Sequence, residues 1–327
     1  MTKESVFDVY TKEVDRHSDL YLKYVDKDSL IYEIKGVDGS GIVEVLTLYP
    51  GIIIQFHNFH CRAFRFIESE GVSNGLKLNF CAEGRMEVRM SDQMFLFMEP
   101  GNFSVDVRKT LDSFIFPSEH YHGIEILIHN SAMDGNIPSY WVDLGIDLKK
   151  IEMLLDEKDN NCIIKVNDTL KCLFQAMQNA PKSCKLNYLR VKVTELFLLL
   201  CSGQVPGSTG NYSLMTLGQV QIAKRVMEKI TYDLSRHYSI ESMAKIYGVS
   251  ASSVKNYFRG VYGKNISVYL REIRMNTAAK ALSLTNRTVS DIASGIGYEN
   301  VSKFAAAFRN FIGESPLEYR RQSRCGI

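Results

Sequence analysis

The chain of 327 residues is long enough for two domains of ordinary size. Hydrophobic residues make up 45% and charged residues 23% of it, which is typical of a globular protein and argues against a fibrous or disordered one. Its most apolar run, residues 196–201, is far shorter than the roughly 20 residues that span a membrane, and the polar N-terminal stretch is unlike a secretory signal, so we expect a cytoplasmic protein with no membrane segment.

The net charge of +2 hides an uneven distribution along the chain. Residues 211–327 hold 17 Lys and Arg against 8 Asp and Glu, whereas the first 210 residues hold 22 against 29. A basic third beside an acidic remainder favours a polyanion-binding module attached to a part with another task. The seven cysteines are odd in number, scattered and without a CxxC pair, which indicates reduced thiols.

Residues 30–129 have the pattern of a β-rich segment. Short runs of Ile, Val, Phe and Tyr are separated by Gly, Pro, Asn and Asp, as in GIVEVLTLYPG and IIIQFHNF. Residues 85–98 alternate in part and turn at residues 91–93, as in a hairpin. Many short strands divided by turns predict a small antiparallel barrel or sandwich.

The periodicity changes to that of helices over residues 141–202. The sequences DLGIDLKKIEMLLDEKD, NDTLKCLFQAMQNA and NYLRVKVTELFLLLCSG predict three amphipathic helices. The last is the most apolar, as expected of a helix buried against a partner (Leu189, Val193, Leu196, Phe197, Leu200). Residues 203–213, GQVPGSTGNYS, have the composition of a linker.

Everything after the linker is predicted to be helical. We expect helices over about 216–234, 240–247, 251–262, 266–284, 289–296, 301–312 and 316–323. Ser239 and Ser250 are N-cap residues, and Thr288 followed by Asp291 resembles a capping box. Pro316 after Ser315 suits a first helical position.

Two helix-turn-helix patterns lie in this segment. In the first, SIESMAKIYGVSASSVKNYFRGVYG over residues 239–263, Gly248 allows the sharp turn and Ser250 caps the next helix. The second, SDIASGIGYENVSKFAAAFRNFIG over residues 290–313, repeats the pattern about 49 residues later. One such pattern is a weak signal, whereas two joined by one helix in a basic segment are a much stronger one.

Residues 216–322 resemble the AraC/XylS family of bacterial transcription factors. The second pattern matches the family signature at several positions (Ile292-Ala293, Gly297-Tyr298, Phe304, Phe308-Arg309, Gly313, Ser315-Pro316, Tyr319-Arg320), with Gly297-Tyr298 in place of the commoner Gly-Phe. The amino-terminal part is similar in architecture to the ligand-sensing halves of this family, in which a cupin-like β-barrel is followed by dimerisation helices.

The resemblance implies an α+β chain in three parts. Residues 1–202 would form a cupin-like, antiparallel β-barrel domain for effector sensing and dimerisation. Residues 203–213 would be the linker. Residues 214–327 would form an all-α DNA-binding domain, in which a long helix joins two tandem helix-turn-helix units.

In that family each recognition helix enters a DNA major groove, and one monomer reads two successive grooves. In the first unit the outward side chains would be Ser252, Lys255, Asn256 and Arg259. Lys255 can donate to guanine and Asn256 can pair with adenine, while Arg259 is better placed for a phosphate.

In the second unit the outward side chains would be Val301, Ser302, Ala305, Ala306 and Arg309, with Lys303 at the edge. Val301 and the alanines can touch a thymine methyl group but donate no hydrogen bond. We therefore expect the second unit to supply affinity and register and the first to supply most of the sequence choice. The alternative is that the alanines are merely small helix formers on a buried face.

Four histidines and a glutamate in the β-rich segment are candidates for other chemistry: His57, His60, His120, His122 and Glu125. Alternate strand positions would place His120 and His122 on one face, as metal ligands require. The spacing to Glu125 is shorter than in metal-binding cupins, and the second half of that motif is not evident. A metal-dependent cupin enzyme is therefore the alternative, and structural histidines are favoured.

We expect a transcriptional regulator that acts as an activator, is not an enzyme and uses no cofactor. It would bind double-stranded DNA as a homodimer and respond to a small-molecule effector in the N-terminal domain, with RNA polymerase as a further partner. A DNA-binding protein without a ligand is a second alternative, but it would not need an acidic segment of about 200 residues.

Overall fold

The computed structural model describes residues 19–64, 75–107, 114–155, 161–203 and 214–325. The chain divides into two units: residues 1–90 with 96–213, called the sheet unit, and residues 91–95 with 214–327, called the helical unit. Residues 204–213 of the predicted linker lie outside the described residues. Among the described residues, no helix is both long enough and apolar enough to cross a membrane.

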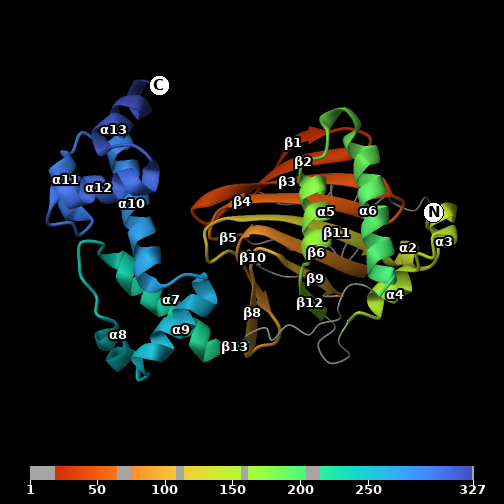
Figure 1. Cartoon of the computed structure of the whole chain (residues 1–327), viewed down its shortest axis with the longest axis horizontal. Helices are drawn as coiled ribbons and strands as arrows, with labels where there is room; N and C mark the ends of the chain where they lie inside the picture. Colours follow the sequence, from red (N-terminus) through yellow and green to blue (C-terminus); the bar gives the residue numbers. More distant parts are fainter. Residues whose placement is uncertain (1–18, 65–74, 108–113, 156–160, 204–213, 326–327) are drawn as a thin grey trace. The chain divides into compact units, whose positions relative to one another are not determined.

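The sheet unit is built on one antiparallel sheet of eight strands, most of which Figure 1 shows side by side. In spatial order the strands are β1 (Leu20–Val25), β2 (Ser29–Gly36), β3 (Gly39–Tyr49), β4 (Ile52–His60), β11 (Tyr121–His129), β6 (Gly75–Gly84), β9 (Asn102–Asp106) and β12 (Asn161–Lys165). A two-stranded sheet pairs β5 (Ala63–Phe64) with β10 (Phe114–Ile115), and β7 (Met86–Arg89) neighbours β8 (Met94–Met98). The hairpin predicted over residues 85–98 is thus confirmed.

The described strands do not form the closed barrel that we expected. β1 pairs with β2 and β12 pairs with β9, so the large sheet has two edges and its ends are not joined by a strand ladder. The region is sheet-rich and antiparallel, as predicted, but its interior is closed by helices and by the smaller sheets rather than by strand pairing. β12 itself was missed, because NCIIK is a short apolar run between two helical patterns.

The two faces of the large sheet bury different sets of side chains. One face packs against α5 (Asp168–Gln178) and α6 (Lys185–Cys201), which lie across the sheet in Figure 1. There the ring of Phe174 stacks on Phe80 with 4.1 Å between ring centroids, and Trp141 is fully buried. The opposite face forms a second hydrophobic cluster with side chains of β7, β8 and β12. The central strands are therefore buried on both sides.

The prediction of one continuous helix as the first of three over residues 141–202 is wrong. The structure has α2 (Asn130–Met133), α3 (Ser139–Asp143) and α4 (Leu148–Glu152), and α3 is separated from α4 at Gly145, whose φ is +71°. A left-handed backbone there ends the helix that the apolar spacing suggested. The other two predicted helices are confirmed as α5 and α6, joined by the short 3₁₀ helix η1 (Lys182–Cys184).

The apolar stripe of α6 does not face a partner chain. Its five apolar side chains are at most 2% exposed, because they pack in the core of the sheet unit itself (Leu189, Val193, Leu196, Phe197, Leu200). The prediction that this stripe forms a dimer interface is therefore wrong, because these side chains are already buried within one chain. Val191 and Leu198, on the other side of α6, are 65% and 39% exposed.

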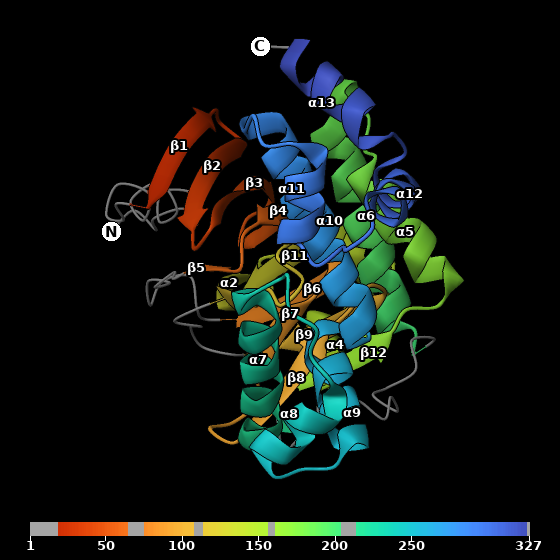
Figure 2. The same cartoon turned by 90° about the vertical axis from the view of Figure 1, so that its left-hand side faces the viewer.

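The helical unit contains seven helices in its described part, and their predicted positions are largely confirmed. They are α7 (Leu217–Tyr232), α8 (Ile240–Tyr247), α9 (Ala251–Tyr262), α10 (Ile266–Leu284), α11 (Val289–Gly295), α12 (Val301–Ile312) and α13 (Pro316–Cys325), after β13 (Met215–Thr216). The expected caps are present: Ser239 accepts from Ser242, Ser250 accepts from Ser253, and Thr288 forms a capping box with Asp291. Within this unit, Figures 1 and 2 show α7 to α9 at one end of α10 and α11 to α13 at the other.

Candidate nucleic-acid interface and internal pocket

The first helix-turn-helix unit consists of α8 and α9. Gly248 ends α8 with a left-handed backbone, φ +66°. On the inner side of α9, Val254 and Phe258 are completely buried. The predicted contact residues Ser252, Lys255, Asn256 and Arg259 are all exposed on the remaining surface of α9. The hydroxyl group of Ser252 also lies 2.8 Å from that of Ser250, so it takes part in the N-cap of the helix.

The second unit consists of α11 and α12. Phe304 and Phe308 are fully buried, and Val301, Ser302, Lys303, Ala306 and Arg309 are exposed, as predicted. Ala305 is only half-buried rather than fully outward, because it borders the side of α12 that packs on the core. The side chain of Asn300, which the sequence analysis missed, caps α12 by accepting from the backbone N–H of Lys303 at 2.9 Å.

The two helices share an electrostatic character. Lys255 and Arg259 are exposed on α9, and Lys303 and Arg309 are exposed on α12. Neither helix contains an Asp or Glu. Each therefore offers an exposed face with positive charge and polar or small side chains, which suits the polyanionic edge of a nucleic-acid groove.

The long helix α10 contacts both helix-turn-helix units. Near its start, the ring of Tyr269 packs edge-on against Phe258 of α9, with 5.4 Å between centroids. Its second half contributes Met275, Ala278 and Leu282 to a cluster with side chains of α11 and α12. The two units thus have hydrophobic cores at different places along one helix, and α10 has to set the spacing between them.

Arg274 lies between these two cores and joins them through polar contacts. Its guanidinium group donates to the carbonyl oxygens of Leu234 at 3.0 Å and Arg236 at 3.1 Å, in the segment that connects α7 to α8. The same group packs against Gly297, in the turn of the second unit: a Cβ atom there would lie 2.8 Å from Arg274 Nη2. Gly297 has φ of +84°, so both conformation and space require glycine.

A second arginine fastens the end of α10. Arg320 of α13 donates to the carbonyl oxygens of Leu282 at 3.3 Å and Arg287 at 2.6 Å. Neither this contact nor that of Arg274 was predicted, because the sequence pattern of an arginine on an amphipathic helix indicates only a solvated side chain. The nearest signal was the family signature, which includes Gly297 and Arg320.

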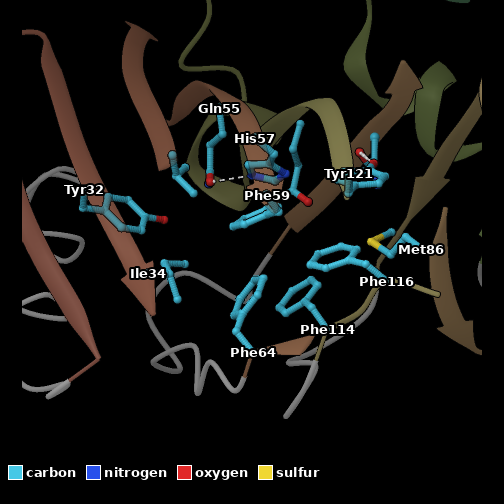
Figure 3. A pocket seen from close by; sticks show the side chains of 13 residues that line it. Tyr32, Ile34, Gln55, His57, Phe59, Phe64, Met86, Phe114, Phe116 and Tyr121 are labelled. Carbon is cyan, nitrogen blue, oxygen red and sulfur yellow. Dashed lines mark hydrogen bonds between the residues drawn. The ribbon is translucent and has the colours of Figure 1, made fainter. Parts of the chain in front are cut away.

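The sheet unit contains an internal pocket on the face of the large sheet opposite α5 and α6. Figure 3 shows its aromatic wall, and the space between the side chains is about 470 Å³, partly open to solvent. Six aromatic residues line it (Tyr32, Phe59, Phe64, Phe114, Phe116, Tyr121), together with Ile34, Val43, Met86, Gln55, His57, Asn79 and Glu125. An apolar cavity with a few convergent polar groups is the usual form of a small-molecule site.

Three polar residues of the pocket, Gln55, Glu125 and Asn79, belong to one row across the sheet, which continues to Ser104. Gln55 of β4 pairs with Glu125 of β11, Glu125 pairs with Asn79 of β6, and Asn79 pairs with Ser104 of β9. Gln55, Asn79 and Ser104 are each at most 5% exposed. Burying a row of polar side chains in an otherwise apolar interior is costly, which makes it a candidate for function rather than for stability.

His57 is the only one of the four predicted histidines that lines this pocket. Its Nε2 atom lies 3.2 Å from Oε1 of Gln55, and its ring packs beside Phe59 (Figure 3). Burial, assisted by the positive charge of Lys77, lowers the pKa of His57 to about 4. His57 is therefore neutral near pH 7 and can both donate and accept a hydrogen bond.

The other histidines lie outside the pocket. His120 Nδ1 is 2.9 Å from the carbonyl oxygen of Ser118, and His122 Nδ1 is 3.6 Å from a carboxylate oxygen of Glu83. The rings of His60 and His122 meet edge to face at 5.5 Å. In the part of the chain that the structure describes, no three His, Cys, Asp or Glu side chains are arranged to hold a metal ion.

Because the pKa of His57 is lowered by folding, the stability of the protein should depend on pH. In the unfolded chain this pKa returns to about 6.5, so between pH 6.5 and pH 4 the unfolded state binds a proton that the folded state does not. The free energy of unfolding should therefore fall as the pH falls through this range, by up to about 3 kcal/mol at about 1.36 kcal/mol per pKa unit.

Urea unfolding at pH 7 and pH 5 measures this effect, with the fluorescence of Trp141, the single tryptophan, as the probe of the sheet unit. His57→Gln, which does not titrate, should show a smaller loss of stability at pH 5 than the wild type. An equal loss in both proteins would contradict the assignment.

Known proteins resemble the helical part of this chain. A family model described as a helix-turn-helix domain matches residues 243–322. The HTH-type transcriptional activator RhaR of Klebsiella pneumoniae is 32% identical over 100 residues, which are 31% of this chain and 36% of RhaR. The regulatory protein SoxS of Salmonella typhimurium is 30% identical over 102 residues, which are 31% of this chain and 95% of SoxS. The solved C-terminal domain of AraT, a response regulator from Geobacillus stearothermophilus, is 30% identical and covers 31% of this chain and 84% of that one, with a TM-score of 0.30.

The chain thus covers little more than a third of the length of RhaR but nearly all of SoxS. Three observations agree: the 30% identity along almost the whole of SoxS, the match to the helix-turn-helix domain, and the two tandem units in the structure. The chain belongs to the AraC/XylS family of helix-turn-helix transcriptional regulators.

Proposed function

We propose that this protein is a sequence-specific DNA-binding transcriptional activator that acts in the cytoplasm and responds to a small molecule. The observation that supports it best is the pair of exposed, cationic helices α9 and α12 attached to one helix, α10. The 19 residues of α10 give it a length of roughly 28 Å at 1.5 Å per residue. That length is close to one turn of DNA, about 34 Å, so two recognition helices can enter successive major grooves on one side of the duplex.

The exposed side chains of α9 are proposed to make most of the base-specific contacts. Lys255 can donate to O6 and N7 of guanine, and the amide of Asn256 can form two hydrogen bonds with adenine. Arg259, nearer the end of the helix, suits a phosphate contact. Because Ser252 is tied to the N-cap, we assign it a supporting contact to the DNA backbone or a base edge.

The exposed side chains of α12 are proposed to supply affinity and register. Val301 and Ala306 can contact a thymine methyl group, and Ala305 lies at the margin of this surface. Ser302 can bond several bases without a strong preference, while Lys303 and Arg309 suit phosphates. Few donors with a defined base preference face outward on this helix.

This division of labour can be tested on an operator with two half-sites. Lys255→Ala and Asn256→Ala should each weaken binding by roughly tenfold to a hundredfold and relax the base preference of the first half-site. Ser302→Ala should weaken binding less and leave the preference of the second half-site unchanged. Fluorescence anisotropy with operators mutated in either half-site measures both effects. Equal losses for mutations in the two half-sites would contradict the division.

The contacts of Arg274 are proposed to fix the spacing at which the two helices bind. An operator lengthened by two base pairs between the half-sites rotates the second groove by roughly 70° about the duplex axis, so the wild type should bind it far more weakly. Arg274→Ala should lose part of this preference for one spacing, because the α7–α8 segment and the Gly297 turn are no longer joined.

Anisotropy measurements with both operators give the ratio of affinities for each protein. Arg271→Ala is the matched control, since Arg271 is an exposed arginine on the same helix. If Arg274→Ala has the same preference for one spacing as the wild type, while its affinity for both operators is reduced, Arg274 is only a stabilising residue.

The sheet unit is proposed to be the cupin-like sensor, with residues 1–202 as the sensing and dimerising domain, 203–213 as the linker and 214–327 as the DNA-binding domain. The internal pocket supports this proposal, because a DNA-binding protein without a ligand would have no use for buried polar groups around a cavity. A bound effector would shift the population between states that differ in DNA binding, and an activator would then recruit RNA polymerase.

Dimerisation is proposed to use the outer side of α6. Val191 and Leu198 are exposed and lie seven residues apart, two helical turns along the same face. Light scattering should give about twice the chain mass of 37.2 kDa for the wild type at micromolar concentration. The double variant Val191→Glu with Leu198→Glu should have the mass of one chain. A wild type with the mass of one chain, or a double variant that remains dimeric, would contradict this surface.

A further inference from the structure

We propose that the effector is a small aromatic molecule that carries hydroxyl or amine hydrogen-bond donors and no anionic group. This inference rests on the proposed role of the pocket as the effector site and adds the chemistry of the ligand. Three features of the pocket carry it: its aromatic wall, the charge of its polar side, and the hydrogen-bonding state of His57.

The aromatic wall favours a planar ligand. The rings of Phe59 and Phe116 stack at 5.1 Å with 17° between their planes, and Phe116 and Tyr121 stack at 5.3 Å with the same angle. Phe64 and Phe114 stack at 4.9 Å with 15° between planes. Figure 3 shows Phe64, Phe114 and Phe116 gathered on the side of the pocket away from Gln55 and His57, with Phe59 beside His57. Nearly parallel rings offer flat faces and edges against which an aromatic ring packs well.

A second cavity in the same unit adjoins the pocket. That cavity shares four lining residues with the first, Asn79, Met86, Phe114 and Glu125, so the two adjoin, and we treat them as two lobes. The second lobe adds Lys77, Ser104 and Asp106 to the polar side. A ligand with a ring in the first lobe therefore meets hydrogen-bonding groups where the lobes join.

The fixed charges of the polar side disfavour an anion. Lys77, which is 9% exposed, pairs across the sheet with Asp106, and Glu125 belongs to the next row of the same face. The two lobes together thus hold one ammonium group and two carboxylates, and His57 adds no positive charge near pH 7. Because charges are screened less inside a protein than in water, this excess of negative charge repels a ligand carboxylate or phosphate and attracts a donor or a cation.

The hydrogen bond between His57 and Gln55 determines which ring nitrogen of His57 can accept a hydrogen bond from a ligand. Oε1 of Gln55 can only accept, so Nε2 of His57 carries the proton and donates to it. In the neutral ring, Nδ1 is then an acceptor. The hydroxyl group of Tyr121 donates to Oδ1 of Asn79 at 2.9 Å, so its oxygen can accept a further bond. Both groups complement a ligand that donates.

Four probes of similar size separate these features. Tyrosol is a neutral phenol with a second hydroxyl group, tyramine is its cationic amine counterpart, para-hydroxyphenylacetate is its anionic counterpart, and cyclohexylethanol lacks the aromatic ring. Isothermal titration calorimetry on the full chain should detect tyrosol and tyramine. The anionic probe should bind at least about tenfold more weakly, because like charges oppose each other in the pocket. The alicyclic probe should also be weaker.

Three variants, each close in size to the native side chain, test the residues. Glu125→Gln should reduce the discrimination between tyrosol and para-hydroxyphenylacetate, because it removes one negative charge from the polar side. His57→Leu should weaken tyrosol by about tenfold, and His57→Gln, whose amide oxygen can accept, should restore part of that loss. Circular dichroism and thermal unfolding identify any variant that is misfolded, and the second His57 variant then carries the test.

The inference fails if the anionic probe binds as tightly as tyrosol, if none of the four probes binds, or if binding is unaffected by both Glu125→Gln and the His57 variants. DNA binding, measured by anisotropy on the same preparations, keeps this separate from the proposed function. A chain that binds its operator but no probe contradicts only the ligand class. A chain that binds no operator DNA contradicts the proposed function, whatever it does with the probes.

Discussion

The geometry of the helical unit depends on one shared helix and one guanidinium group. Each helix-turn-helix unit has its own small core, and α10 enters both, through Tyr269 at one end and through Met275, Ala278 and Leu282 at the other. Arg274 donates to two carbonyl groups of the segment that leads from α7 into the first unit and fills the space over Gly297 in the second. A helix is stiff along its length, and a guanidinium donates several bonds in a fixed plane, so the combination resists both sliding and rotation of one unit against the other. Two grooves of a duplex stand at a fixed distance and angle, and a protein that reads both needs such a joint.

The large sheet divides its two faces between a tightly packed core and the pocket. The face under α5 and α6 is apolar and tightly filled, with Trp141, Phe80 and Phe174 at its centre. The opposite face carries the row of Gln55, Glu125, Asn79 and Ser104 beside an aromatic wall. Since successive side chains of a strand point to opposite faces, one strand can contribute to both the core and the pocket. In β6, Leu78 and Phe80 pack in the core while Lys77 and Asn79 line the cavities.

Several expectations failed for identifiable physical reasons. The spacing of Leu144, Leu148 and Ile151 predicted one helix. In the structure a left-handed backbone at Gly145 separates α3 from α4, and the spacing of apolar residues gives no information about the backbone conformation of a glycine. The apolar stripe of α6 indicated burial correctly, yet periodicity cannot tell a stripe that packs on its own sheet from one that packs on a partner. The four histidines look alike in the sequence. The structure directs His57 into the pocket, whereas His120 bonds back to Ser118 and His122 lies by Glu83.

The sequence by itself determined the helical part of this protein. Capping residues, glycine turns and the spacing of apolar residues act within a few positions of one another, so the bounds of α8, α9, α10 and α12 and the exposure of Lys255, Asn256 and Arg309 could be predicted from local pattern. Only the tertiary structure decided the order of the strands, the open edges of the sheet, the polar row of the pocket and the contacts of Arg274. These depend on pairing between residues far apart in the chain: β11 lies between β4 and β6, and Arg274 meets Leu234 and Gly297. Such pairings are chosen by the packing of the whole unit, and no short stretch of sequence records them.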